Sequence, residues 1–137
     1  IDFTVYEGLR TKARQSELVK SGDSTTMNSR HLTGHAVDIA PLSNGKISWA
    51  WPLYYRLAPF VKQAADDLGV EIEWGGDWKS FKDGPHWQLP WDEYAADDHQ
   101  SRIRRAPSPD APPAVEIPHQ GVRATIYAAF QSIFGRK

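Results

Sequence analysis

The stretch SRHLTGHAVDIAP, residues 29–41, gathers His31, His35 and Asp38 within eight positions. Imidazole and carboxylate groups are the ligands available for a zinc ion in this chain, because it contains no cysteine. His31 and Asp38 are seven residues apart, which is not the i, i+4 spacing of one helical turn. Gly34 can supply a turn between a loop residue and a strand residue. The stretch therefore indicates either a metal site or ordinary polar residues where a loop enters a strand.

A catalytic zinc site uses three protein ligands and keeps one position for water, so a third ligand must come from elsewhere in the chain. His86 follows a Gly-Pro turn and enters the apolar stretch HWQL, which favours it as the partner. His99 and His119 lie in a polar segment and a proline-rich one, which suit a rigid site poorly. A single histidine beside a glycine turn is more often a loop side chain than a metal ligand, and Asp38 could simply cap the end of a strand. We expect His35 to lie beside the site or at the surface rather than to bind metal.

Two further side chains could complete a hydrolytic site. Asp83 stands three residues before His86, and a carboxylate there could take a proton from an attacking water and return it to the leaving amine. Arg10 follows Gly8 at the end of a predicted strand, where a cation could stabilise an oxyanion. The competing interpretation of Arg10 is an exposed charge at a strand end.

The elements that must position these residues follow an α+β pattern rather than regular βαβ alternation. Strands are expected over residues 3–10, 35–41, 70–76 and 86–91, and helices over residues 11–22 and 52–70. Gly22 and Gly69 are typical helix ends, Pro41 should close the second strand, and Pro59 should bend or break the second helix. The apolar stripe of that helix consists of Leu53, Leu57, Phe60, Val61, Ala64 and Leu68.

Charge divides the chain into two parts, although the net charge is only −1. Residues 1–100 carry 10 Lys and Arg against 15 Asp and Glu, whereas residues 101–137 carry 6 against 2. This favours an attached basic tail over a nucleic-acid-binding protein. Residues 99–119, with five prolines, are predicted to form a linker, and residues 120–137 a basic amphipathic helix. That helix is expected either to contact an anionic membrane or to pack on the preceding domain or a second chain.

The motifs around the candidate ligands carry a family resemblance. SRHLTGHAVDIAP resembles the S-x-H-x-x-G-x-A-x-D signature of the zinc D-alanyl-D-alanine peptidases and their relatives. Together with EGLRTKARQ and DGPHWQL, it looks most like the L-alanyl-D-glutamate peptidases of bacteriophage endolysins. The resemblance covers about residues 1–92. It implies the small α+β zinc-peptidase fold, also found in Hedgehog-type relatives, with a central antiparallel sheet flanked by helices.

The resemblance also implies a role for each residue of the motifs. His31, Asp38 and His86 would bind one Zn²⁺, Asp83 would be the catalytic base, and Arg10 would stabilise the transition state. Residues 1–98 would form the catalytic domain, without the helical segment that usually precedes the first strand in this family. Four residues are expected to line a substrate cleft, although the tryptophans are equally well explained as core residues: Ser29, Trp74, Trp78 and Trp87.

The function implied is hydrolysis of peptidoglycan stem peptides at the L-Ala–D-Glu bond, in phage-driven lysis or wall remodelling. We expect a monomer, made in the bacterial cytoplasm, that acts at the cell wall or in the periplasm. D-alanyl-D-alanine carboxypeptidase activity would use the same zinc, base and motif. A cell-wall-binding module with a structural zinc is the alternative from outside the enzymes, although a structural site would need neither Asp83 nor Arg10.

Overall fold

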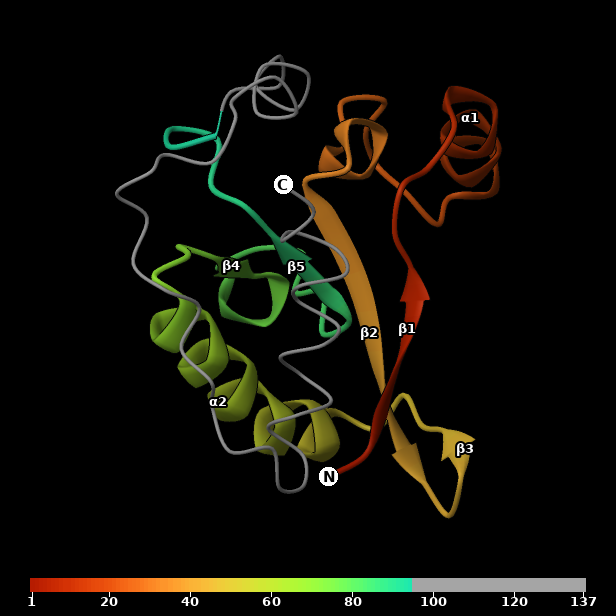
Figure 1. Ribbon diagram of the computed structural model, residues 1–137. Helices are drawn as coiled ribbons and strands as arrows, with labels where there is room; N and C mark the ends of the chain where they lie inside the picture. Colours follow the sequence, from red (N-terminus) through yellow and green to blue (C-terminus); the bar gives the residue numbers. More distant parts are fainter. Residues whose placement is uncertain (95–137) are drawn as a thin grey trace.

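An antiparallel sheet built around one long strand organises the computed structural model, which describes residues 1–94 (Figure 1). The long strand β2 pairs with β1 on one side and β5 on the other, and β4 follows β5. A short strand, β3, extends the far end of β2 as a hairpin. The strands are β1 (Phe3–Glu7), β2 (Ala36–Ser43), β3 (Lys46–Ile47), β4 (Glu73–Trp74) and β5 (His86–Gln88). The expected α+β class with a central antiparallel sheet is confirmed.

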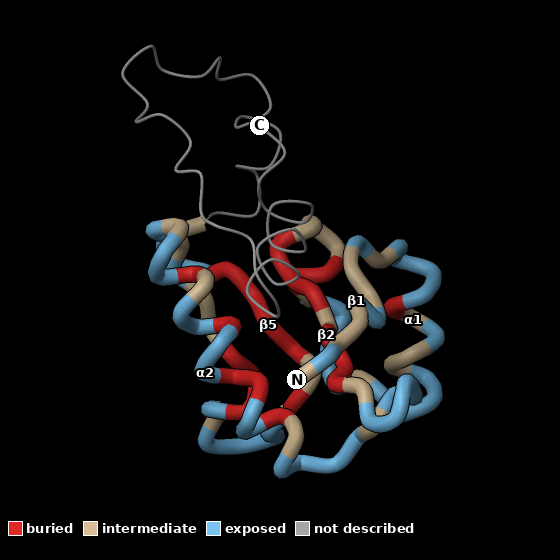
Figure 2. The backbone as a smooth tube through the Cα atoms, turned by 60° about the horizontal axis from the view of Figure 1, so that its bottom comes forward, coloured by how far each residue is buried: buried red, intermediate tan, exposed pale blue. Residues whose placement is uncertain are grey.

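The two faces of the sheet differ because side chains alternate along each strand. Val37 on β2, Trp87 on β5 and Trp74 on β4 are buried and belong to one hydrophobic core. The helix α2 (Trp51–Leu68) supplies the other side of that core, and Figure 2 shows buried residues along β2, β5 and parts of α2. The strand residues between these core positions therefore face away from α2, and Asp38 and His86 are among them.

Both predicted helices form and end at the expected glycines. The helix α1 (Lys12–Ser21) begins at Thr11, whose side chain accepts a hydrogen bond from the Arg14 N–H. Gly22, with a φ of 82°, ends this helix in the left-handed conformation that glycine adopts at little cost. In α2 the apolar face differs from the predicted stripe, because Tyr54 and Ala58 are buried whereas Phe60 is 47% exposed.

Of the two effects predicted for Pro59, a bend or a break, the break does not occur, since α2 continues through Pro59 to Leu68. Proline removes one hydrogen bond, to the carbonyl of Tyr55 four residues earlier. Both residues are exposed, so water can bond to that carbonyl. On the opposite side, burial of Leu57 and Val61 holds the helix together.

Strand β2 also runs further than expected. It passes Pro41 and reaches Ser43, where a turn through Asn44 and Gly45 leads into β3. The sequence SNGK predicts that turn, but the two-residue strand after it was not anticipated. The predicted linker at 99–119 and helix at 120–137 lie outside the described residues. Among residues 1–94, no helix has the length and apolar character needed to cross a membrane.

Candidate metal centre

Three elements bring the predicted ligands together. His31 lies in a short 3₁₀ helix, Arg30–Thr33, which Ser29 begins by accepting a hydrogen bond from the His31 N–H. Gly34 ends this turn with a φ of 72°, which lets the chain reverse into β2. Asp38 on β2 is the register partner of His86 on β5. Antiparallel pairing therefore places the aspartate and the second histidine side by side on one face of the sheet.

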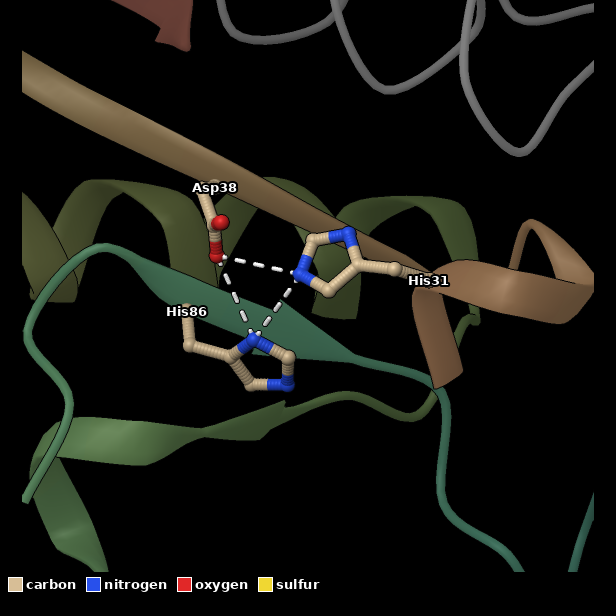
Figure 3. Close-up of side chains that lie close together, drawn as sticks. All are labelled: His31, Asp38 and His86. Carbon is tan, nitrogen blue, oxygen red and sulfur yellow. Dashed lines mark hydrogen bonds and ion pairs between the residues drawn. The ribbon is translucent and has the colours of Figure 1, made fainter. Parts of the chain in front are cut away.

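The three candidate ligand atoms form a nearly equilateral triangle (Figure 3). His31 Nε2 lies 3.3 Å from Asp38 Oδ1, His86 Nδ1 lies 3.2 Å from the same oxygen, and the two nitrogens are 3.2 Å apart. Ligands at about 2.0–2.1 Å from a tetrahedral zinc ion are separated by about 3.3 Å from one another. The spacing of the three atoms thus fits a single tetrahedrally coordinated ion.

Hydrogen bonds on the far side of each ring orient the two imidazoles. Figure 3 shows that the second nitrogen of each ring points away from the triangle. His31 Nδ1 lies 2.8 Å from the carbonyl oxygen of Gly8, and His86 Nε2 lies 3.0 Å from Gln88 Oε1. Because both of these oxygens can only accept, each distant nitrogen carries the hydrogen. The lone pairs of His31 Nε2 and His86 Nδ1 then face Asp38, an arrangement that suits a bound cation.

The electrostatics of this group favour an ionised aspartate. Burial alone would raise the pKa of Asp38, but when the imidazoles of His31 and His86 are protonated in the metal-free protein their contacts with the carboxylate outweigh that effect and hold the pKa well below its usual range. Burial also opposes the charged form of His86, yet bonds with Asp38 and Gln88 give a net increase in its pKa. A group that holds a charged carboxylate against two imidazoles can bind a metal ion, and among residues 1–94 these three side chains form such a group.

Arg10 lies on the other side of Asp38. Its Nη2 contacts Glu7 and lies 3.5 Å from Asp38 Oδ2, while Nη1 donates to Gln15 Oε1 at 2.7 Å. Asp38 therefore presents one oxygen to the histidines and the other to Arg10. The guanidinium Nε is buried and has no hydrogen-bond partner among the described residues. Gln15, which is fully buried, is itself fixed by bonds to the Ser24 hydroxyl and the Thr26 carbonyl.

Asp83 approaches the triangle from the loop before β5. Its backbone N–H donates to the carbonyl of Gly75 at 3.0 Å, which anchors the loop to the start of the 3₁₀ helix η2, Gly75–Asp77. Burial, followed by the charge of Asp38, raises the pKa of Asp83. Burial and the charges of Asp83 and Asp38 likewise raise the pKa of Tyr54 to about 12. A carboxylate whose pKa is raised is better suited to accept and then release a proton.

A cleft of about 620 Å³ opens over the three candidate ligands, and Asp83, Arg10 and Ser29 also line it. Among the predicted substrate residues, Trp78 lies in this cleft with its ring 5.2 Å from that of His86. The expectation that Trp74 and Trp87 line it is wrong. They are 5% and 2% exposed and stack on each other in the core.

Strand alternation explains this correction. His86 and Gln88 on β5, with Glu73 on β4, face the site, so Trp87 and Trp74 between them face the core. His35 does not join the triangle; it is buried, and its Nδ1 contacts the Thr33 hydroxyl.

Several residues of the site were not predicted from the sequence. Gln88 and Glu73 form a hydrogen-bonded chain behind His86, and nothing in their spacing predicts it. A register shift between Val5 and Glu7 brings Glu7 opposite Asp38 and leaves Tyr6 as an extra residue in β1. Tyr6 and other exposed aromatic residues line the cleft: Trp49, Phe81 and Trp91.

Comparison with known proteins identifies the family. The family described as phage L-alanyl-D-glutamate peptidase matches residues 1–89. The chain belongs to this peptidase family.

Individual proteins similar to this chain carry the same family name. The L-alanyl-D-glutamate peptidase of Listeria phage A118 is 38% identical over 97 residues, which cover 71% of this chain and 34% of that protein. The L-alanyl-D-glutamate peptidase of Escherichia phage T5 is 35% identical over 86 residues, covering 60% and 63% respectively. The chain thus spans between one third and two thirds of these two proteins. The crystal structure of the Serratia marcescens L-Ala D-Glu endopeptidase ChiX matches with 51% identity and a TM-score of 0.65, over 69% of this chain and 71% of that one.

Proposed function

We propose that this chain is a zinc peptidase that cleaves the L-Ala–D-Glu bond of peptidoglycan stem peptides. The observation that carries the proposal is the triangle of His31, Asp38 and His86 at tetrahedral spacing, with Asp83 beside it in an open cleft. Membership of a family named for L-alanyl-D-glutamate peptidase activity supports the choice of bond. We further propose a monomer that is made in the cytoplasm and acts at the bacterial cell wall.

The mechanism assigns one task to each side chain. A bound Zn²⁺ would supply Lewis-acid chemistry to the scissile carbonyl and to the attacking water. His31, Asp38 and His86 would hold it, and three ligands leave room for a fourth. Asp83 would accept the proton of the attacking water and pass it to the amine of the leaving D-Glu, so that the broken amide becomes a carboxylate and an amine.

Arg10 and the cleft walls would position the substrate. The Arg10 guanidinium would stabilise negative charge that develops on the scissile carbonyl oxygen, and it also fixes the outer oxygen of Asp38. Trp78 and Ser29, which line the cleft, are proposed to contact the peptide. Ser29 has a second task, because its hydroxyl also begins the turn that carries His31.

The test is mass analysis of muropeptides after digestion of purified sacculi. Metal-free, zinc-restored and Asp83→Asn proteins are compared under identical conditions. The proposal predicts zinc-dependent products with L-Ala left on muramic acid and a new D-Glu amino terminus. Released D-Ala would instead identify a D-alanyl-D-alanine carboxypeptidase. Bound zinc without any released peptide would identify a binding module with a structural metal.

The predicted basic helix at residues 120–137 stays a separate proposal. We propose that it contacts an anionic membrane, on the basis of its predicted apolar face and flanking arginines. Co-sedimentation of the full chain and of a chain lacking residues 120–137 with anionic liposomes at low salt tests this. Equal sedimentation of the two chains would remove the membrane contact.

A further inference from the structure

A chain of two side-chain hydrogen bonds lies behind the second histidine of the metal centre. His86 Nε2 donates to Gln88 Oε1 at 3.0 Å, and Gln88 Nε2 donates to Glu73 Oε2 at 2.7 Å. Gln88 is 7% exposed, and it is the register partner of Glu73 across β5 and β4. Both residues face the site because they alternate with the buried tryptophans of the core. The pairing of β4 with β5 thus determines the positions of all three hydrogen-bonded residues.

The chemistry of these groups allows one direction for the hydrogen bonds. The carboxylate of Glu73 accepts only, so the amide nitrogen of Gln88 must face it. The amide oxygen of Gln88 then faces His86, and that oxygen can only accept. His86 must therefore carry its hydrogen on Nε2 and keep the lone pair of Nδ1 free. That lone pair lies 3.2 Å from Asp38 Oδ1 and from His31 Nε2.

The other histidine is oriented differently. His31 donates to the backbone carbonyl of Gly8, a partner that no side-chain substitution removes. Of the two histidines, only His86 is therefore oriented by side chains that a substitution can change.

We propose that Glu73 and Gln88 are positioning residues that select the tautomer of His86 and thereby set the affinity of the centre for zinc. The proposal rests on the metal-binding part of the proposed function and not on the bond that is cleaved. Partners that orient a ligating histidine typically change metal affinity by about 10–100-fold when they are removed. The selection is directional, so reversing the polarity at residue 73 should reverse the tautomer.

The experiment measures zinc affinity by competition with a chelator in the full chain. Glu73→Lys replaces an acceptor with a donor, which turns the Gln88 amide and forces hydrogen onto Nδ1 of His86. We expect a loss of about 10–100-fold in affinity. Glu71→Lys is the matched control, because Glu71 is exposed, lies two residues away and undergoes the same change in charge. Its affinity should stay close to that of the unaltered chain.

The double variant Glu73→Lys/Gln88→Glu supplies the decisive rescue. A carboxylate at position 88 can accept from both the new lysine and His86 Nε2, which restores the direction of the bonds. Affinity should return toward the original value although two residues are changed. Nitrogen-15 spectra of the metal-free proteins, recorded at a pH where His86 is neutral, give a second readout. Hydrogen should lie on Nε2 of His86 in the unaltered chain and the double variant, and on Nδ1 in Glu73→Lys.

Thermal unfolding of each metal-free variant separates loss of fold from loss of positioning. If Glu73→Lys does not fold, Gln88→Met, which removes the acceptor without adding charge, takes its place with the same expected loss. Unchanged affinity and an unchanged tautomer in the folded variants would overturn the proposal. Zinc binding is measured without substrate. If zinc affinity depends on Glu73 and Gln88 as predicted but the protein cleaves no peptide, the proposed function is contradicted and the positioning role is not.

Discussion

Gly75 is the point at which a single added methyl group should damage the site without touching its functional groups. A Cβ at this position would lie 2.5 Å from the Asp83 carbonyl oxygen, 3.0 Å from Asp83 Cβ and 3.2 Å from His86 Cβ. The backbone of Gly75 is in an ordinary conformation, so Gly75→Ala adds volume without adding strain in φ. The perturbation therefore acts through space alone.

The size of the effect follows from these distances. The loop that carries Asp83 must move by about 0.9 Å to restore an ordinary contact of 3.4 Å to its carbonyl oxygen. Overpacking of this kind costs about 1–3 kcal/mol of unfolding free energy. A displacement of about 1 Å at a reacting group lowers the rate by about 10²-fold. Since the Asp83 N–H is bonded to the Gly75 carbonyl, the loop cannot move away freely.

Two assays check Gly75→Ala, namely kcat/KM on a purified muropeptide and urea unfolding of the metal-free protein. Gly8→Ala is the matched control, because a Cβ at Gly8 has no neighbour within 4 Å and the carbonyl that binds His31 is kept. The control should retain both rate and stability. If Gly75→Ala cleaves as fast as the unaltered chain, the reaction does not depend on the exact position of the loop that carries Asp83, and the reasoning from these distances is refuted.

Three further predictions concern the charged and polar groups of the site. Asp83→Asn should lower kcat by about 10²–10⁴-fold while zinc stays bound, as measured by metal analysis beside the activity assay; full activity would exclude Asp83 as the base. Gln15→Leu should lower the free energy of unfolding by about 1–3 kcal/mol, because Arg10 loses a buried partner; an unchanged urea midpoint would contradict this. In metal-free protein the pKa of His86 is raised although burial opposes it, so protonated His86 stabilises the folded state. This contribution to the free energy of unfolding is complete below the ordinary histidine pKa of 6.5 and is lost as pH rises through the raised pKa. Thermal unfolding in chelator should show this loss in the unaltered chain and not in His86→Ala, and equal pH profiles would contradict it.

The sequence predicts the local surroundings of the three candidate ligands, because each stands beside a turn or strand signal. Gly34 marks the turn after His31, and alternation places Asp38 on a strand. The Gly-Pro turn places His86 at the start of another strand. What the residues alone leave open is whether these segments meet, since the pairing of Asp38 with His86 joins positions 48 residues apart. The family motifs supply that connection.

Tertiary packing decides the features that the sequence does not predict. The sequence around Trp74 and Trp87 does not distinguish a cleft residue from a core residue. The register of β4 and β5 directs both side chains toward α2. Pro59 is tolerated because its exposed position lets water replace the lost hydrogen bond. The hydrogen bond from Gln88 to Glu73 depends on the same register, so only the folded structure reveals it.

The central claim is that one zinc ion is held by His31 Nε2, Asp38 Oδ1 and His86 Nδ1. Anomalous diffraction at the zinc edge, from crystals of zinc-loaded protein, tests it most directly. The account predicts a single strong peak at about 2.0–2.1 Å from each of the three atoms. A peak bound through Nε2 of His86, or one centred on other residues, would contradict it.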